Sequence, residues 1–246
     1  MSVIAGFPLS TLAFLWAGAF VGGVASGGAG FAFALAASSI WLHAFDPLLT
    51  TALTVTCGTL LQFVTIWPFR KEFDRGRLAP FILGAAIGVP LGVAVLSSVD
   101  VPKLKIAIGL GLVIYGTYAI LAPTLPRVNG GGRKADAAVG FAGGVLGGIG
   151  GYSGVLPTIW SQLRGWPKST ARAVYQPYIL FANFLSIALI GAVAFDSRGA
   201  WLFLLSLPAL ALGGWAGMAI FSRLDERLFR KFLAGMLLAS GLMLLI

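Results

Sequence analysis

The sequence predicts an all-α polytopic membrane protein built from two inverted-topology repeats, residues 1–125 and 126–246, within one integral membrane domain. Three observations predict this fold: long apolar segments, a glycine-rich break in each half, and the placement of the positive charges. Of the 246 residues, 58% are hydrophobic and only 10% are charged, and the mean hydropathy is +0.93. This composition excludes a water-soluble globular domain. The net charge of +9 lies in short gaps between apolar segments, so we expect no nucleic-acid partner.

Ten apolar segments are expected to be helices, and most reach the roughly 20 residues that cross a bilayer. They occupy residues 7–23, 31–45, 48–69, 78–97, 101–122, 135–149, 155–163, 173–195, 200–221 and 228–246. The four segments beside the glycine breaks are too short for comfortable separate crossings. We therefore expect a short-helix hairpin at each break, followed in each half by three long transmembrane helices.

The two breaks lie at residues 22–30 and 143–154, inside otherwise apolar sequence. Glycine costs about 1 kcal/mol relative to alanine at a helical position. A cluster of glycines therefore indicates the end of a helix, a close approach of two backbones, or both.

An internal repeat connects the segments. The Gly-x-x-x-Gly stretches at residues 88–94 and 213–219 align with each other, and the two breaks align at nearly the same offset. Gln62 of the first half aligns with Asn183 of the second half when a small deletion is allowed. A polar linker rich in glycine and proline joins the halves.

The positive charges indicate how each broken pair is arranged. If each pair enters the membrane and returns, fourteen Lys and Arg residues fall on one side and only Lys103, Lys105 and Arg198 on the other. A single crossing by each pair would give a nearly even split. The count therefore favours hairpins, with both termini on the non-cytoplasmic side, and fits re-entrant hairpins and two short crossings equally. Each half then crosses an odd number of times, so the halves are inverted, as in alternating-access secondary transporters.

The two breaks together are expected to bind a small anion. The second helix of each pair begins at its break, so its free N–H groups and positive dipole end would point toward the bilayer centre. Such a site needs no charged side chain. Polar side chains on the long helices could line it, or could instead bond between helices. The expected binding residues are Gly27, Gly28, Ala29, Gly30, Gly151, Tyr152, Ser153, Gly154, Gln62 and Asn183.

Several other kinds of site are not expected. No Asp, Glu, Lys or Arg lies at mid-depth in the long apolar segments, which argues against a carboxylate proton relay or a cation cage. His43 and Cys57 stand alone, so we expect no catalytic site, no metal site and no cofactor. Arg164, Lys168 and Arg172 are expected at the cytoplasmic mouth of the second hairpin. There they would attract anions, determine topology or contact anionic lipid.

The repeated break resembles the sulfite exporter TauE/SafE family. The resemblance rests on Gly22-Gly23 and Gly27-Gly28-Ala29-Gly30 in the first half and on residues 147–154 in the second. The alanine-rich helix after Trp166-Pro167-Lys168 fits as well, and the match covers essentially the whole chain. It implies a bacterial inner-membrane transporter that exports small sulfur-containing anions such as sulfite, sulfonates or thiosulfate. The first break has Gly28-Ala29 where the second has Tyr152-Ser153, so hydroxyl contacts are expected mainly from the second half.

The main alternative is a carrier or channel for another small organic or inorganic anion. A channel would conduct without saturation at low substrate concentration. The expected partners are the anion and the lipid bilayer. A proton or sodium ion as the coupling ion, and a homodimer, are both compatible with a secondary carrier.

Overall fold

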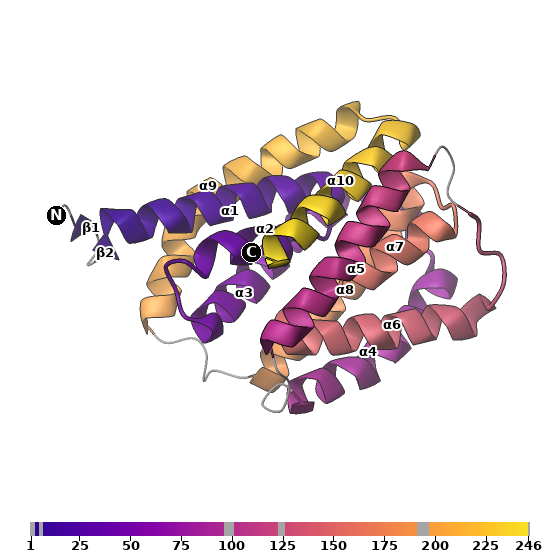
Figure 1. The fold of residues 1–246 in the computed structure, drawn as a ribbon, viewed down its shortest axis with the longest axis horizontal. Helices are drawn as coiled ribbons and strands as arrows, with labels where there is room; N and C mark the ends of the chain where they lie inside the picture. The colour runs from indigo at the N-terminus through magenta and orange to yellow at the C-terminus, as the bar shows by residue number, and fades with distance from the viewer. Residues whose placement is uncertain (1–2, 5–6, 96–100, 123–125, 191–196, 246) are drawn as a thin grey trace.

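The computed structural model describes residues 3–4, 7–95, 101–122, 126–190 and 197–245 (Figure 1). Nearly all of these residues are helical. The helices are α1 (Leu9–Ala29), α2 (Phe33–Trp41), α3 (Pro47–Ile66), η1 (Trp67–Glu72), α4 (Arg75–Val95), α5 (Val101–Leu121), α6 (Gly132–Gly150), α7 (Val155–Leu163), α8 (Lys168–Ile190), α9 (Ser197–Arg223) and α10 (Glu226–Leu245). Two-residue strands, β1 (Val3–Ile4) and β2 (Phe7–Pro8), pair near the N-terminus. Residues 123–125 of the predicted linker lie outside the described residues.

Among the described residues, four helical segments are long and apolar enough to cross a membrane by length and composition. They comprise residues Leu9–Ala29, Leu49–Glu72, Arg75–Val95 and Ser197–Arg223. Large apolar side chains also cover the outer surface, and Leu83, Ile114 and Trp215 are each about two-thirds exposed or more. A surface of this kind belongs against lipid rather than water. Both features support the predicted polytopic membrane protein.

The helices of the two halves pack against one another in equivalent pairs. Helix α1 lies along α9, and α6 lies along α4, so the first long helix of each half packs on the fourth helix of the other half (Figure 1). Helices α5 and α10 form a third pair, and α3 contacts α8. This pairing is the one that the aligned repeat would produce. The inverted orientation of the halves and their boundary at residue 125 remain predictions.

Glycines make the two equivalent helix pairs possible. A Cβ atom on Gly88 or Gly92 of α4 would collide with a carbonyl oxygen of α6, at Phe141 and Val145 respectively. Gly213 and Gly217 of α9 make the same contacts with the carbonyl oxygens of Phe20 and Val24 in α1. Small residues let helix backbones approach closely in membrane bundles. The two Gly-x-x-x-Gly stretches aligned in the sequence therefore make equivalent contacts in the fold.

The predicted pair of half-helices at each break is correct for the second helix and wrong for the first. Helices α2 and α7 have nine residues each, whereas α1 has 21 and α6 has 19. Four of the five glycines of the first break lie inside α1, where Gly23 and Gly27 permit contact with α9. The helix ends only at Gly30, which has a φ of 84°, and α6 ends in the same way at Gly151, with a φ of 75°. One glycine in the left-handed conformation is enough to stop a helix.

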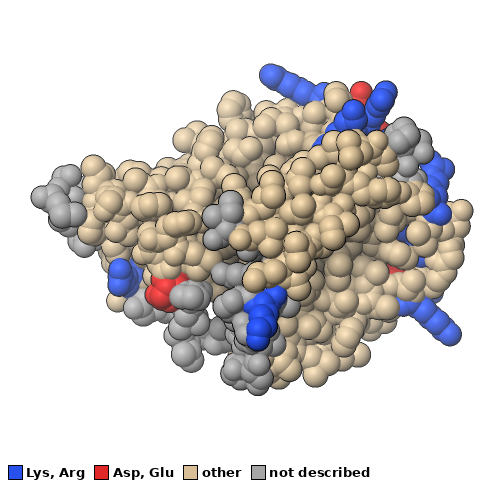
Figure 2. Space-filling view, viewed as in Figure 1, with Lys and Arg blue, Asp and Glu red and all other residues tan. Residues whose placement is uncertain are grey.

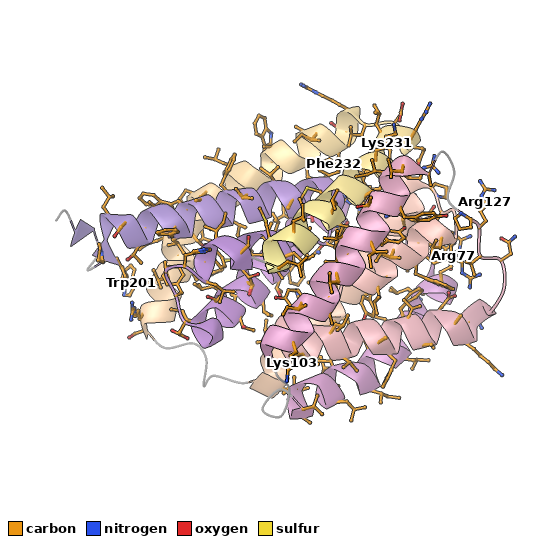
Figure 3. All side chains as sticks on the ribbon, viewed as in Figure 1. Arg77, Lys103, Arg127, Trp201, Lys231 and Phe232 are labelled. Carbon is orange, nitrogen blue, oxygen red and sulfur yellow. The ribbon has the colours of Figure 1, made fainter. Side chains whose placement is uncertain are left out.

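Positive charges gather toward one end of the molecule, which we call the basic end (Figure 2). Arg77, Arg127 and Lys231 lie there, and Lys103 lies at the opposite end of α5 (Figure 3). This separation agrees with the charge count. The sequence places Arg172 with Arg164 and Lys168 at the mouth of the second hairpin, where its charge would face anions or lipid headgroups. Arg172 is instead fully buried, so its charge faces neither. The orientation of the basic end in the membrane remains a prediction.

Candidate functional site

A small cavity, which we call the central cavity, lies between the two breaks. Its volume is about 10 Å³, and residues of α2, α3, α8 and both breaks surround it. The lining residues are Phe31, Phe33, Ala34, Thr54, Val55, Gly58, Gln62, Gly151, Ile179 and Asn183. A volume of this size holds about one water molecule. Gly151 of the second break and Phe31, directly after the first break, therefore border the same space, which is too small for a sulfur oxyanion in this structure.

The first break turns the chain sharply into α2. The N–H of Gly30 closes the end of α1 by donating to the carbonyl oxygen of Ser26 at 2.6 Å, and Phe31 and Ala32 complete the turn. The first intrahelical bond of α2 is donated by Ala36, so the N–H groups of Phe33 and Ala34 have no acceptor within the helix. Both of these residues line the central cavity. The positive end of α2 therefore lies at the cavity, as the sequence predicts.

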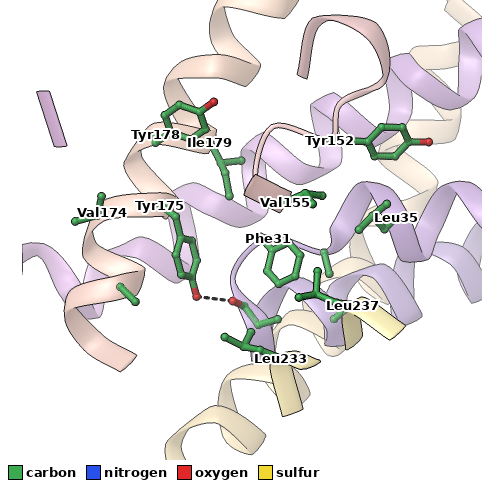
Figure 4. Close-up of a cluster of buried hydrophobic side chains, with 14 of the residues drawn as sticks. Phe31, Leu35, Tyr152, Val155, Val174, Tyr175, Tyr178, Ile179, Leu233 and Leu237 are labelled. Atoms are coloured by element: carbon green, nitrogen blue, oxygen red, sulfur yellow. Dashed lines mark hydrogen bonds between the residues drawn. The ribbon is translucent and has the colours of Figure 1, made fainter. Parts of the chain in front are cut away.

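The carbonyl groups at the end of α1 are bonded to other helices. Gly27 and Gly28 accept from Arg172 Nη2 and Nη1 at 3.0 and 3.3 Å. The Tyr175 hydroxyl donates to Ala29 O at 2.6 Å, the bond drawn in Figure 4. Gln62 Nε2 donates to Gly30 O at 2.8 Å. These four consecutive positions, all predicted to bind substrate, present their carbonyl groups to protein donors in this conformation.

Arg172 is the main residue that the sequence reasoning missed. Its side chain is fully buried, and its guanidinium lies 4.9 Å from the ring of Phe69 and 4.3 Å from that of Phe221. No carboxylate pairs with it within the described residues. A cation is favourable at the negative end of a helix dipole, here that of α1. A signal was present in the sequence, because Arg172 lies one helical turn before Gln176 on the polar stripe that leads to Asn183.

Gln62 and Asn183, the two amides matched across the repeat, both line the central cavity but differ in their bonding. Gln62 Oε1 accepts from Gln176 Nε2 at 3.0 Å, and Gln176 also donates to Thr65 at 3.0 Å, so this network joins α3 to α8. Asn183 is 7% exposed and has no hydrogen-bond partner among the described residues. Gln62 therefore serves as a bond between helices, while the Asn183 amide is free at the cavity.

The residues of the second break are divided between cavity and packing. Gly151 lines the central cavity, whereas Gly154 packs against Phe31 and Ile179. Ser153 is fully buried against Gly147 of α6, and its hydroxyl has no partner among the described residues.

The Tyr152 and Ser153 side chains do not line the cavity in this conformation. Tyr152 belongs instead to a buried apolar cluster that includes Phe31, Val155, Ile179 and Leu233 (Figure 4). Of the ten predicted binding residues, the structure brings Gly151, Gln62 and Asn183 to the cavity wall.

The long apolar helices and the apolar outer surface define the class of the protein as a multi-pass membrane protein. The family model described as Sulfite exporter TauE/SafE matches residues 15–244. The chain therefore belongs to this family, which is a family of membrane transporters and not of enzymes. No curated protein and no solved structure matches the chain.

Proposed function

We propose that this protein is a secondary transporter that exports small sulfur-containing anions such as sulfite, sulfonates or thiosulfate. The anion binds at the central cavity, near the bilayer midplane, between the two breaks. Family membership supports the substrate class. The observation that carries the binding site is the unpaired amide of Asn183, which lies at the same cavity as the free N–H groups at the start of α2.

The donors around the cavity suit an oxyanion. An asparagine amide offers two N–H donors, and the N–H groups of Phe33 and Ala34 lie at the positive end of a helix. No Asp or Glu is among the described lining residues, so nothing there repels a negative charge. Sulfite and sulfonate oxygens accept several hydrogen bonds at once. The lack of a lining Lys or Arg keeps the site uncharged, which favours release of the anion after transport.

Binding requires a change in conformation. A cavity of about 10 Å³ cannot hold a sulfur atom with three oxygens. The breaks must separate, and we propose that the two halves, as inverted repeats, move against each other to open the cavity to one side of the membrane at a time. In the opened state the hydroxyl groups of Tyr152 and Ser153 would become available to the anion.

Thermal unfolding in detergent tests this site. The wild-type protein is heated with sulfite, thiosulfate, sulfoacetate, taurine, formate, nitrate or chloride, next to Asn183→Leu and the control Ser186→Ala. Ser186 is buried on the same helix and does not line the cavity. A ligand at a hundred times its dissociation constant stabilises the folded state by about 2.7 kcal/mol. We expect sulfur anions to raise the melting temperature of the wild type and the control clearly more than that of Asn183→Leu, which lacks the central site.

Other results would change the assignment. If formate, nitrate or chloride stabilises the protein better than any sulfur anion, a carrier or channel for another anion is correct. If no anion shifts the melting temperature of the wild type, the proposed site is wrong.

We propose a bacterial inner-membrane location with the basic end in the cytoplasm, which places both termini on the non-cytoplasmic side. The excess of Lys and Arg at that end supports this orientation (Figure 2). A proton or sodium ion is the proposed coupling ion, and a homodimer remains compatible with the apolar outer surface. Enzymatic reporters fused to the C-terminus test the orientation, since alkaline phosphatase is active only outside the cytoplasm.

A further inference from the structure

A second and larger cavity, which we call the vestibule, opens at the basic end of the molecule. Its volume is about 530 Å³, and it lies between the turn after α7, the start of α8 and the start of α10. Its polar and charged lining includes Arg127, Gln162, Trp166, Lys168, Glu226 and Arg230. The central cavity shares none of its lining residues. The vestibule is therefore a separate space.

The charges around the vestibule favour an anion. Three cations line it against one carboxylate, that of Glu226. This carboxylate accepts from the backbone N–H of Lys168 at 2.9 and 3.1 Å, where it caps the start of α8. The Lys168 ammonium donates to the carbonyl oxygen of Leu224. Arg127 and Arg230 have no carboxylate partner within the described part of the chain, so their positive charges remain to attract an anion.

Gln162 supplies a second, independent observation. Its side chain borders the vestibule and is only 7% exposed, yet neither its amide nitrogen nor its amide oxygen has a hydrogen-bond partner among the described residues. A buried amide without a partner is costly, and most such groups in proteins are bonded. An oxyanion oxygen in the vestibule would accept from Gln162 Nε2. An unpaired donor beside unpaired cations is the arrangement of an anion site.

The vestibule also connects to the first break through a chain of contacts. Phe229 lines the vestibule and packs on Phe221 at 5.2 Å, and the ring of Phe221 lies under the Arg172 guanidinium. Arg172 in turn bonds to Gly27 and Gly28 at the end of α1. The vestibule is thus linked by contacts to the end of α1 at the first break.

We propose that the vestibule binds a free sulfur oxyanion at the basic end before the anion reaches the central cavity. The inference rests on the proposed transport function and adds a second site to it. Gln162 and Arg230 are the binding residues. The site raises the local concentration of the anion at the side from which it is exported.

Two vestibule variants and one matched control test the site. Gln162→Leu and Arg230→Gln change the vestibule, while Arg223→Gln removes an exposed cation on α9 that does not line it. The variants are made both alone and in an Asn183→Leu background, which removes the proposed central site. Binding of sulfite is measured by calorimetry in detergent without lipid, and uptake is measured in inside-out vesicles.

In the Asn183→Leu background we expect one equivalent of sulfite to remain bound. Adding Gln162→Leu or Arg230→Gln to that background should raise the dissociation constant of sulfite about tenfold, as the loss of a charge-assisted hydrogen bond implies. In the otherwise wild-type protein, Gln162→Leu and Arg230→Gln should each raise the KM for transport several-fold and leave kcat nearly unchanged. Arg223→Gln should have the KM and kcat of the wild type. Unchanged binding and KM in both vestibule variants would overturn the proposal. So would binding of phosphatidylglycerol but not of free sulfite, because the vestibule would then be a lipid site. Binding that depends on Gln162 and Arg230 in a wild-type protein that shows no transport would uphold the vestibule and refute the proposed function.

Discussion

Replacement of Arg172 should destabilise the protein more than replacement of any surface cation. The guanidinium donates to two carbonyl groups at the end of α1 and lies on the rings of Phe69 and Phe221. Hydrogen bonds from a charged donor contribute about 1.5–3 kcal/mol each, and a desolvated cation–π contact contributes up to about 2 kcal/mol. Arg172→Met fills much of the volume and removes the cost of burying a charge, which offsets part of the loss. We expect a net loss of about 3 kcal/mol.

The measurement is thermal unfolding of the purified protein by tryptophan fluorescence. A loss of about 3 kcal/mol corresponds to a fall of about 6–12 °C in a protein of this size. Arg172→Lys keeps the charge, but lysine lacks the planar guanidinium that reaches both carbonyl groups. Its melting temperature should therefore fall by roughly half as much. Arg75→Met, at an exposed site, is the control and should melt within about 2 °C of the wild type. If Arg172→Met has the same melting temperature as Arg75→Met, Arg172 does not hold the end of α1 in place.

Three further predictions concern a close helix contact, a buried hydrogen bond and the lone cysteine. Gly217→Ala should lower the free energy of unfolding by about 1–3 kcal/mol, because the new Cβ would collide with the backbone of α1. Gly235→Ala has open space around it and should raise the free energy of unfolding by about 0.5–1 kcal/mol. Equal shifts of the two variants in denaturant unfolding would contradict the close α1–α9 contact. Tyr175→Phe removes the bond to Ala29 O and should cost about 1–2 kcal/mol in the same assay, so an unchanged midpoint would show that this bond contributes nothing. Cys57→Ala removes a 3.4 Å contact with Ser206 but should leave transport intact. Complete loss of transport in a folded Cys57→Ala protein would indicate a functional thiol.

Hydropathy and glycine placement were enough to predict most of the architecture. The apolar segments predicted the order of the helices. The aligned Gly-x-x-x-Gly stretches lie where α4 meets α6 and α9 meets α1, but their alignment alone did not predict which helices would pair. The lengths of α1 and α6 could not be predicted in this way, because a glycine that ends a helix and one that packs inside it look alike in a sequence. Only the left-handed conformation of Gly30 and Gly151 separates the two uses.

The candidate site was predicted in part for a similar reason. The repeat alignment brought Gln62 and Asn183 together, and both line the central cavity. Arg172 was counted with the surface cations because a charge near the end of an apolar segment is usually exposed, and its partners are backbone carbonyls that no sequence pattern reveals. The packing of Ser153 against α6 was likewise invisible, since it depends on the space that Gly147 leaves.

The most direct test of the central claim is sulfite transport by the purified protein in liposomes, with wild type, Asn183→Leu and the control Ser186→Ala compared at equal amounts of folded protein. Our account predicts saturable transport by the wild type and the control, and a loss of at least tenfold in kcat/KM for Asn183→Leu, equivalent to about 1.4 kcal/mol or more. Equal transport by Asn183→Leu and the wild type would contradict an anion site at the central cavity.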